Sequence, residues 1–373
     1  MARKGENIYK RKDGRWEGRY RKARNEHGQL VYGYVYGRKY TEVKQKLERL
    51  KIDYAFSLQP QTVFNGTLNE WMTYWLNQLI ANQIKQSTYA SYQQKITQHI
   101  LPLLGSRPLT ALNEKDLEKL LVQLGEKGLS NATIHTIFTI INAALSKAIK
   151  ERIIKENPCI LVDLPKIRRP EILVLTRAQQ RQLEQTALKE KNCSPVIIAL
   201  YTGMRIGEIS GLKWGDVDLD NRTIQVQRTI QRISTPNGPT KTTVIAGTPK
   251  TKSSLRTIPI ADNLVKYLAS KKKYTNSPFV IGTARGYMEP RLISLHFKRL
   301  ATLLGLENIH FHALRHTFAT RCIEQGIDVA TVSKLLGHKS TKMTLDTYTG
   351  SLWETREQAM ALIDHQLSLM EEV

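Results

Sequence analysis

A histidine and an arginine at helical spacing are the first candidates for chemistry in this sequence. In FHALRHTFAT, residues 311–320, the apolar residues recur at the 3.6-residue spacing of a buried helix face. His312 and Arg315 are three residues apart, so they project from the same side of that helix. A cationic pair beside a core is costly unless an anion meets it. We therefore expect an anionic partner for this pair.

Two further segments hold cations that could complete an anion site. Arg205 follows an apolar run and Gly203 in ALYTGMRIGEISGLKW, and an arginine so embedded normally meets a carboxylate or a phosphate. The simpler alternative is a structural ion pair with Glu208, three residues on. Lys250 and Lys252 bracket a tight bend in GTPKTKSSLRTIPI. A hairpin lysine can give up a proton if its pKa is lowered, although two solvated turn lysines are the alternative.

The segment LLGHKSTKMTLDTYTG, residues 335–350, supplies another histidine and a tyrosine. His338 follows a helix-ending glycine, and Tyr348 lies ten residues further on. A tyrosine hydroxyl is a poor nucleophile near neutral pH because its pKa is about 10. Beside two guanidinium groups and a histidine its oxyanion becomes accessible. The alternative is a half-buried core tyrosine, the commoner fate of any one of the 15 tyrosines here.

Taken in chain order, these segments resemble the tyrosine recombinase (phage integrase) family, of the type found in prophages and conjugative transposons. The matching stretches are TGMRIGEISGLKW, PKTKSSLRTIPI, HALRHTFAT and LLGHKSTKMTLDTY. The resemblance implies an enzyme that cuts and rejoins DNA through a 3′-phosphotyrosyl intermediate. It implies no metal, nucleotide or other cofactor, and the anion would be a phosphodiester.

The resemblance also implies a role for each residue that binds the phosphate. Arg205 and Arg315 would clamp the non-bridging oxygens of the scissile phosphate. His312 would act as general base or phosphate donor, and His338 as a second hydrogen-bonding histidine. Glu208 would support these side chains without touching the DNA.

The remaining roles concern proton transfer and attack. Lys250 resembles the general acid that protonates the leaving 5′-oxygen, with Lys252 as its rival because the K-T-K spacing leaves the register open. Tyr348 resembles the nucleophile, and Asp216 a further supporting residue. The segment between His338 and Tyr348 is one residue longer than in some relatives.

Composition agrees with a polyanionic partner. The 373 residues include 56 Lys and Arg against 33 Asp and Glu, a formal charge of +23. The three cysteines are far apart and form no C-x-x-C pair, which disfavours a disulfide framework or zinc ribbon and fits the cytosol. The sequence HFHALRH could suggest a metal site, but the arginine within it disfavours a bound cation. No apolar run approaches 18 residues, so we expect no membrane span and a cytoplasmic, nucleoid-associated protein.

Residues 1–56 are predicted to form a small DNA-binding domain of three antiparallel strands and one helix. Turn signals at 12–15 and 25–28 separate the three runs, and Thr41 is the expected N-cap of the helix. The first 40 residues hold 12 Lys and Arg against 4 Asp and Glu. Alternation places Arg15, Arg19 and Arg21 on one face, opposite Trp16 and Tyr20. A basic sheet face can enter a DNA groove, and the alternative is a solvated charged face.

Residues 57–66 are predicted to be a linker, residues 67–160 a helical core-site DNA-binding bundle, and residues 161–172 a second linker. Within the bundle, caps are expected near Ser87, at Asn113 and near Ser130. Lys85 and Tyr89 could face a phosphate backbone, although such a face is usually only solvated.

Residues 173–373 are predicted to form an α+β, mainly helical catalytic domain with strands near 222–260. After Tyr348, SLWETREQAMALIDHQLSLM has the pattern of an amphipathic helix. Such a helix could cover its own core, but by the resemblance we expect it to dock on a neighbouring protomer.

The resulting hypothesis is a site-specific recombinase that integrates and excises a mobile element. The resemblance implies double-stranded DNA with core and arm att sites as substrate, a homotetramer on that DNA, and an excisionase and a DNA-bending host protein as further partners. The alternatives are a catalytically idle DNA-binding regulator and a type IB topoisomerase. A chromosome-dimer resolvase is disfavoured because those enzymes usually lack the basic N-terminal domain.

Overall fold

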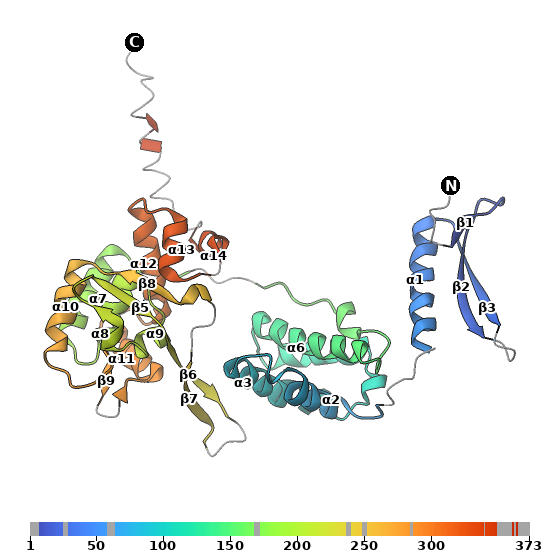
Figure 1. Ribbon diagram of the computed structural model, residues 1–373, viewed down its shortest axis with the longest axis horizontal. Helices are drawn as coiled ribbons and strands as arrows, with labels where there is room; N and C mark the ends of the chain where they lie inside the picture. The colour runs from blue at the N-terminus through green and yellow to red at the C-terminus, as the bar shows by residue number, and fades with distance from the viewer. Residues whose placement is uncertain are drawn as a thin grey trace, which may run out of the picture. The chain divides into compact units, whose positions relative to one another are not determined.

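The chain divides into two compact units, Met1–Arg168 and Arg169–Val373 (Figure 1). The computed structural model describes residues 7–24, 29–57, 64–167, 172–235, 240–247, 252–283, 286–338, 340–348, 360–361 and 363–364. The expected turn at 25–28 and nearly all of the expected C-terminal docking helix lie outside these residues.

The first unit begins with the predicted sheet and helix. Strands β1 (Ile8–Lys10), β2 (Trp16–Arg24) and β3 (Leu30–Gly37) form an antiparallel sheet in the order β1-β2-β3. Helix α1 (Tyr40–Ser57) packs on one face, where Val43 and Leu47 are at most 1 % exposed. The three-strand prediction is confirmed. The predicted cap is wrong, because α1 begins at Tyr40 and Thr41 therefore lies inside its first turn.

The rest of the first unit is helical, as predicted. Its elements are α2 (Leu68–Tyr74), the π-helical η1 (Trp75–Ile80), α3 (Gln86–Lys95), the π-helical η2 (Ile96–Ile100), α4 (Leu101–Leu104), the 3-10 turn η3 (Leu109–Ala111), α5 (Glu114–Glu126), α6 (Asn131–Lys150) and the 3-10 turn η4 (Pro158–Leu161). Asn113 caps α5 in a capping box with Asp116, and the Ser130 side chain accepts from the first turn of α6. The cap expected near Ser87 is wrong, since α3 begins at Gln86 after Lys85.

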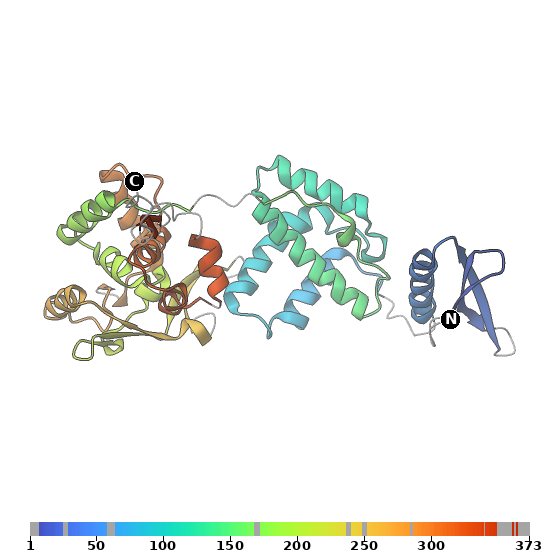
Figure 2. The same ribbon diagram turned by 90° about the horizontal axis from the view of Figure 1, so that it is seen from above.

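Helix α6 lies at the centre of the bundle core. Its inward residues Ile137, Ile140, Ile141 and Leu145 are fully buried, and Figure 2 shows the bundle helices packed side by side. This helix is also long and apolar enough to cross a membrane by length and composition alone. Its burial among the other helices is that of a core helix in a bundle.

The segment after the bundle is less extended than its prolines suggest. Pro158–Leu161 forms the turn η4, in which Cys159 is 9 % exposed, and Val162 just beyond it is equally buried. Both side chains belong to the bundle core. The three prolines within residues 156–172 predict an extended linker, and that prediction is wrong for Pro158–Leu161, which forms a turn.

The second unit is α+β and mainly helical, which confirms the predicted class. Its helices are α7 (Arg177–Lys189), α8 (Ser194–Thr202), α9 (Ile206–Ser210), α10 (Asp262–Lys272), α11 (Pro290–Leu303), α12 (His312–Glu324), α13 (Val329–Leu336) and α14 (Thr341–Tyr348). Its 3-10 turns are η5 (Trp214–Asp216) and η6 (Lys252–Ser254).

Short strands accompany these helices, and four of them lie within residues 222–260, where the sequence predicts strands. They are β4 (Val217–Asp218), β5 (Thr223–Val226), β6 (Thr229–Ser234), β7 (Thr242–Gly247), β8 (Arg256–Pro259), β9 (Gly282–Thr283) and β10 (Gly286–Tyr287). They pair as β4-β5-β8, as the hairpin β6-β7 and as β10-β9. The hairpin leads toward η6 and β8, the segment of the predicted basic bend.

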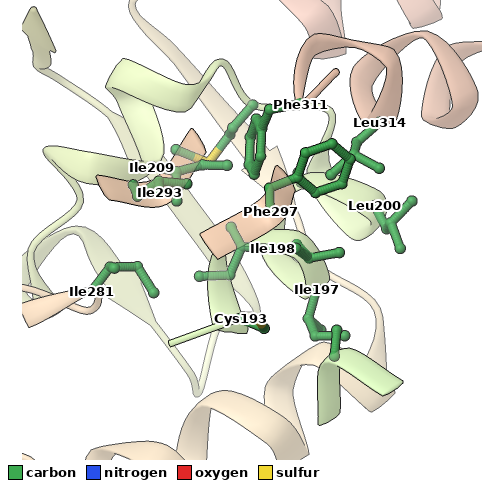
Figure 3. Close-up of a cluster of buried hydrophobic side chains, with 14 of the residues drawn as sticks. Cys193, Ile197, Ile198, Leu200, Ile209, Ile281, Ile293, Phe297, Phe311 and Leu314 are labelled. Atoms are coloured by element: carbon green, nitrogen blue, oxygen red, sulfur yellow. The ribbon is translucent and has the colours of Figure 1, made fainter. Parts of the chain in front are cut away.

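The core of the second unit fixes the position of α12. Phe297 of α11 meets Phe311 edge-on, with ring centroids 5.5 Å apart, and Leu314 is fully buried beside them (Figure 3). Helices α8 and α11 supply further side chains in this view, including Ile198 and Ile293. The apolar face of FHALRHTFAT is thus buried, as its spacing predicts. The opposite side of the first turn of α12 carries the candidate chemistry.

Candidate active site

Arg315 is held by the C-terminal ends of two helices. Its side chain is almost completely buried, and the residue is 2 % exposed. Nη1 donates to the Gly203 carbonyl oxygen at 2.8 Å, and Nη2 donates to the Leu336 carbonyl oxygen at 2.7 Å. Gly203 follows α8 and Leu336 ends α13, so both oxygens lie where a helix carries partial negative charge. The guanidinium is therefore fixed by backbone dipoles.

Two glycines make this arrangement possible. Gly203 and Gly337 end their helices in the left-handed region, with φ of 63° and 66°. A Cβ atom on Gly203 would lie 2.5 Å from the Phe318 ring and 2.8 Å from a Leu336 methyl carbon. A Cβ atom on Gly337 would lie 3.0 Å from the Ser253 carbonyl oxygen. A side chain at Gly203 would have to displace Phe318 or Leu336, and one at Gly337 would press on Ser253 and Arg256.

Glu208 is the buried carboxylate of the site. It is 3 % exposed and accepts hydrogen bonds from Arg205 Nη1 at 2.8 Å and Arg256 Nη2 at 2.9 Å. Burial by itself would raise the pKa of Glu208, but the two arginines outweigh it and the pKa is lowered. The simpler alternative for Arg205, an ion pair with Glu208, is thus present. Arg205 also keeps 36 % of its side chain exposed, enough to meet a ligand.

Arg256 is a member of this cluster that the sequence reasoning missed. It begins β8, its side chain is 6 % exposed, and its Nε donates to the Leu335 carbonyl oxygen at 2.6 Å. A signal was present, since alternation along β8 places Arg256 on the face of the buried Ile258 and Ile260. An arginine on a buried strand face needs an acidic partner, and here that partner is Glu208.

Three histidines lie near these cations in the neutral form. Burial first, and then the positive charges around them, lower the pKa of His312, His316 and His338 to about 4. Arg315 contributes to all three shifts, and Arg205 contributes to those of His312 and His338. His312 keeps an exposed edge, while its ring meets His316 edge-on at 4.8 Å. The structure therefore brings together Arg205, Arg315, His312 and His338, as the resemblance implies.

His338 makes a second kind of contact, with α14. Its Nδ1 lies 2.8 Å from Oγ1 of Thr344, which is fully buried. Tyr348 is the last residue of the same helix, and its side chain lies outside the described part of the chain. Lys250 lies wholly outside it. Lys252 is described only by its backbone, which begins η6.

Asp216 lies in a separate ion pair. It is 6 % exposed, forms a short hydrogen bond with Arg228 and accepts from the Lys213 backbone at 2.9 Å. Among the described residues, no group of three or more His, Cys, Asp or Glu side chains is arranged to hold a metal ion.

The candidate DNA contacts of the sheet have a distinct arrangement. Arg15, Arg19 and Arg21 are exposed, whereas Trp16 and Tyr20 are partly buried toward α1, as alternation predicts. The Arg19 guanidinium lies 3.6 Å from the centroid of the Tyr32 ring. Such stacking limits the freedom of the side chain and leaves its donors available.

The other predicted contacts are less free. Arg15 lies before β2 and pairs with Asp13 at 2.9 Å. In the bundle, Lys85 is exposed at the start of α3, while the Tyr89 hydroxyl donates to Asn77 at 2.6 Å. Tyr89 is therefore already bonded within the bundle.

Comparison with known proteins identifies the class. The model of the phage integrase family matches residues 167–354, just over half of the chain. The phage integrase N-terminal SAM-like domain matches residues 67–124. The chain is therefore a DNA-recombining enzyme of the tyrosine class, which cuts and rejoins DNA through a tyrosine intermediate. It belongs to the phage integrase family, and the resemblance inferred from its motifs is confirmed.

Individual relatives agree with this assignment. A tyrosine recombinase XerC-like protein of Caldanaerobacter subterraneus subsp. tengcongensis is 25 % identical over 370 residues, spanning 92 % of this chain and 94 % of the relative. The ICEBs1 integrase of Bacillus subtilis is 25 % identical over 293 residues, spanning 74 % of this chain and 77 % of the relative.

Solved structures share the fold. The Tn1549 transposon integrase, in complex with a circular intermediate DNA, has a TM-score of 0.67 at 23 % identity and covers 80 % of this chain and 99 % of its own. A lambda integrase dimer bound to a COC′ core site has a TM-score of 0.59 at 22 % identity and covers 93 % of this chain and 96 % of its own.

Proposed function

We propose that this recombinase integrates and excises a mobile genetic element by attacking a DNA phosphodiester with Tyr348. One observation carries the proposal. Two guanidinium groups, those of Arg205 and Arg256, bond to the single carboxylate of Glu208, and Arg315 lies near enough to act with both of them on the charge of His338. The cluster keeps an excess of positive charge, and a phosphate is the anion that complements it.

The reaction would proceed by transfer of the phosphoryl group. The Tyr348 oxygen forms a bond to phosphorus while the bond from phosphorus to the 5′-oxygen breaks. The tyrosine proton passes to a base, and Lys250 or Lys252 supplies a proton to the leaving 5′-oxygen. Because the 3′-phosphotyrosyl bond conserves the energy of the broken bond, a second strand can be joined without a nucleotide cofactor.

The arginines would stabilise the charge that develops on phosphorus. Planar, bidentate donors fit the non-bridging oxygens, and a clamping arginine in phosphoryl transfer is worth roughly 10³ to 10⁵ in rate. Arg315 needs no reorganisation for this task, because its two carbonyl partners hold it in place. Neutral His312 is suited to accept a proton, and a bound phosphate would raise its pKa from about 4 toward the working range.

The N-terminal sheet supports a separate DNA contact at arm sites. Arg19 and Arg21 are exposed, and Arg19 is stacked on Tyr32. We expect the bundle and the second unit to bind core sites, with four protomers exchanging strands pairwise. The tetramer is supported by the lambda integrase, whose structure is described as a tetramer bound to a Holliday junction. An excisionase, a DNA-bending host protein, a docking C-terminal helix and association with the nucleoid complete the proposal.

The test is capture of the covalent intermediate. The protein would be incubated, in EDTA, with nicked duplexes from the ends of the element that carries its gene, and resolved on a denaturing gel. We expect a covalent protein–DNA band with the natural chain and with Tyr274→Phe, a control at a side chain that is 89 % exposed. We expect no band with Tyr348→Phe. Retardation on a native gel, with no covalent band from any variant, would favour the idle regulator instead.

A further inference from the structure

The helix that carries Tyr348 is connected to His338 through one buried hydroxyl group. Thr344 lies four residues, about one helical turn, before Tyr348 in α14. The Thr344 side chain is fully buried, and its Oγ1 lies 2.8 Å from His338 Nδ1. The main chain of His338 is also held, because its backbone N–H donates to the Ser333 carbonyl oxygen at 3.0 Å.

The direction of this hydrogen bond follows from the burial of the hydroxyl. A threonine hydroxyl has one proton to donate, and a buried donor left without an acceptor costs about 1–3 kcal/mol. Within the described part of the chain, the one recorded partner of the Thr344 hydroxyl is His338 Nδ1. If Nδ1 carried the imidazole proton, the hydroxyl proton would have no acceptor among the described residues. The satisfied arrangement has Thr344 donating and Nδ1 accepting.

A neutral imidazole that accepts at Nδ1 must carry its proton on Nε2. We propose that Thr344 is a positioning residue that holds His338 in this form, so that Nε2–H is a hydrogen-bond donor toward the phosphate. This inference deepens the proposed function and rests on it. His338 would then act as a donor and not as a base, which leaves His312 as the histidine that can accept a proton.

The same contact couples two parts of the reaction. When α14 is docked, Thr344 sets the form of His338, and the helix turn that leads to Tyr348 is fixed with it. If α14 moves away, His338 loses the partner that selects its donor form. Correct placement of the nucleophile and correct preparation of the phosphate-binding histidine therefore depend on one hydrogen bond.

Two substitutions separate the hydroxyl from the volume of the side chain. Thr344→Val keeps the shape and removes the donor, and Thr344→Ser keeps the donor. We expect Thr344→Val to lower the rate of covalent-complex formation on the nicked duplex about tenfold, and Thr344→Ser to stay within about threefold of the natural chain. Thr320→Val is the matched control, because Thr320 is buried and its hydroxyl has no hydrogen-bond partner among the described residues. We expect that control to keep full activity.

A double-mutant cycle shows whether the effect passes through His338. In a His338→Gln background, Thr344→Val should lose most of its effect on rate, since its partner is already gone. A purely structural role of Thr344 in α14 would leave the tenfold loss intact in that background. That result would overturn the proposal.

A second measurement reads the form of His338 in the natural chain directly. In the full-length protein containing nitrogen-15 histidine, NMR distinguishes a protonated ring nitrogen from an unprotonated one, and His338→Gln identifies the signal. We expect protonation at Nε2 in the natural chain, and an Nδ1–H form would refute the inference. These outcomes are distinct from failure of the proposed function, in which the natural chain itself would form no covalent band.

Discussion

Glu208→Gln tests whether the buried carboxylate neutralises the arginine cluster. The change keeps the shape of the side chain but removes its charge, and it presents an amide donor to arginines that are themselves donors. Glu208 is 3 % exposed, and the side chain of Arg256 is 6 % exposed, so water cannot replace the lost charge. Removing one partner of such a buried pair costs about 3–5 kcal/mol.

The expected loss lies at the lower end of that range. Arg205 is 36 % exposed and can turn toward solvent, while Arg256 keeps its bond to the Leu335 carbonyl oxygen. We therefore expect the free energy of unfolding to fall by about 3 kcal/mol, which lowers the melting temperature of a unit of this size by about 6–12 °C. Calorimetry of the full chain would measure the transition of the second unit.

A surface pair in the same unit provides the control. Arg222 pairs with Asp262, and both side chains are more than 60 % exposed, so Arg222→Gln should change stability by less than about 1 kcal/mol. The pH dependence adds a second check. The pKa of Glu208 is lowered in the folded chain, so its stabilisation is present above the ordinary glutamate range and is lost as the pH falls through the folded value. A Glu208→Gln loss no larger than the control, or one that persists unchanged in acid, would refute this reasoning.

Two further predictions concern the histidines and the sheet. Folding lowers the pKa of His316 and His338 to about 4, so the unfolded chain binds more protons than the folded chain between pH 6.5 and 4. The free energy of unfolding should therefore decrease as the pH is lowered through that window, by up to about 1.4 kcal/mol per pH unit for each ring. Urea unfolding at pH 7 and 5.5 measures this, and an unchanged slope in His316→Gln would contradict it. In the sheet, Tyr32→Leu should weaken arm-site binding about two- to fivefold without changing its salt dependence, because it removes only the ring beneath Arg19. Arg19→Gln should weaken binding and also reduce by about one the slope of log affinity against log salt concentration. Fluorescence anisotropy with a duplex measures both effects. An equal change of slope in the two variants would contradict this division of roles.

Local signals in the sequence predicted local structure well. The strands of the sheet and the helices α5 and α6 were placed by turn residues and caps that act within a few positions, such as Asn113 with Asp116. The errors are also local. Thr41 and Ser87 are good capping residues, but α1 begins at Tyr40 and α3 begins at Gln86, one residue before each of them.

The sequence predicts most of the residues that form the site, but not the contacts between them. The spacing of His312 and Arg315 places them on one side of α12, whereas the Arg315 acceptor on Gly203 is 112 residues away in sequence. Nothing in residue type indicates that two helix ends would converge on that guanidinium. Arg256 was missed for a different reason. Its alternation with buried residues was visible, but its partner Glu208 lies 48 residues earlier, on a different element.

The support of Arg315 by main-chain oxygens affects how the site tolerates mutation. A carboxylate partner could be lost by one substitution, but the Gly203 and Leu336 oxygens remain whatever side chains surround them. Sensitivity to mutation moves to the two left-handed glycines, where a Cβ atom is strained by the backbone conformation; at Gly203 it also overlaps its neighbours, and at Gly337 it is tightly packed. Saturation mutagenesis should therefore find Gly203 intolerant of other residues and Gly337 less so, although neither contributes an atom to the bonds that are made and broken.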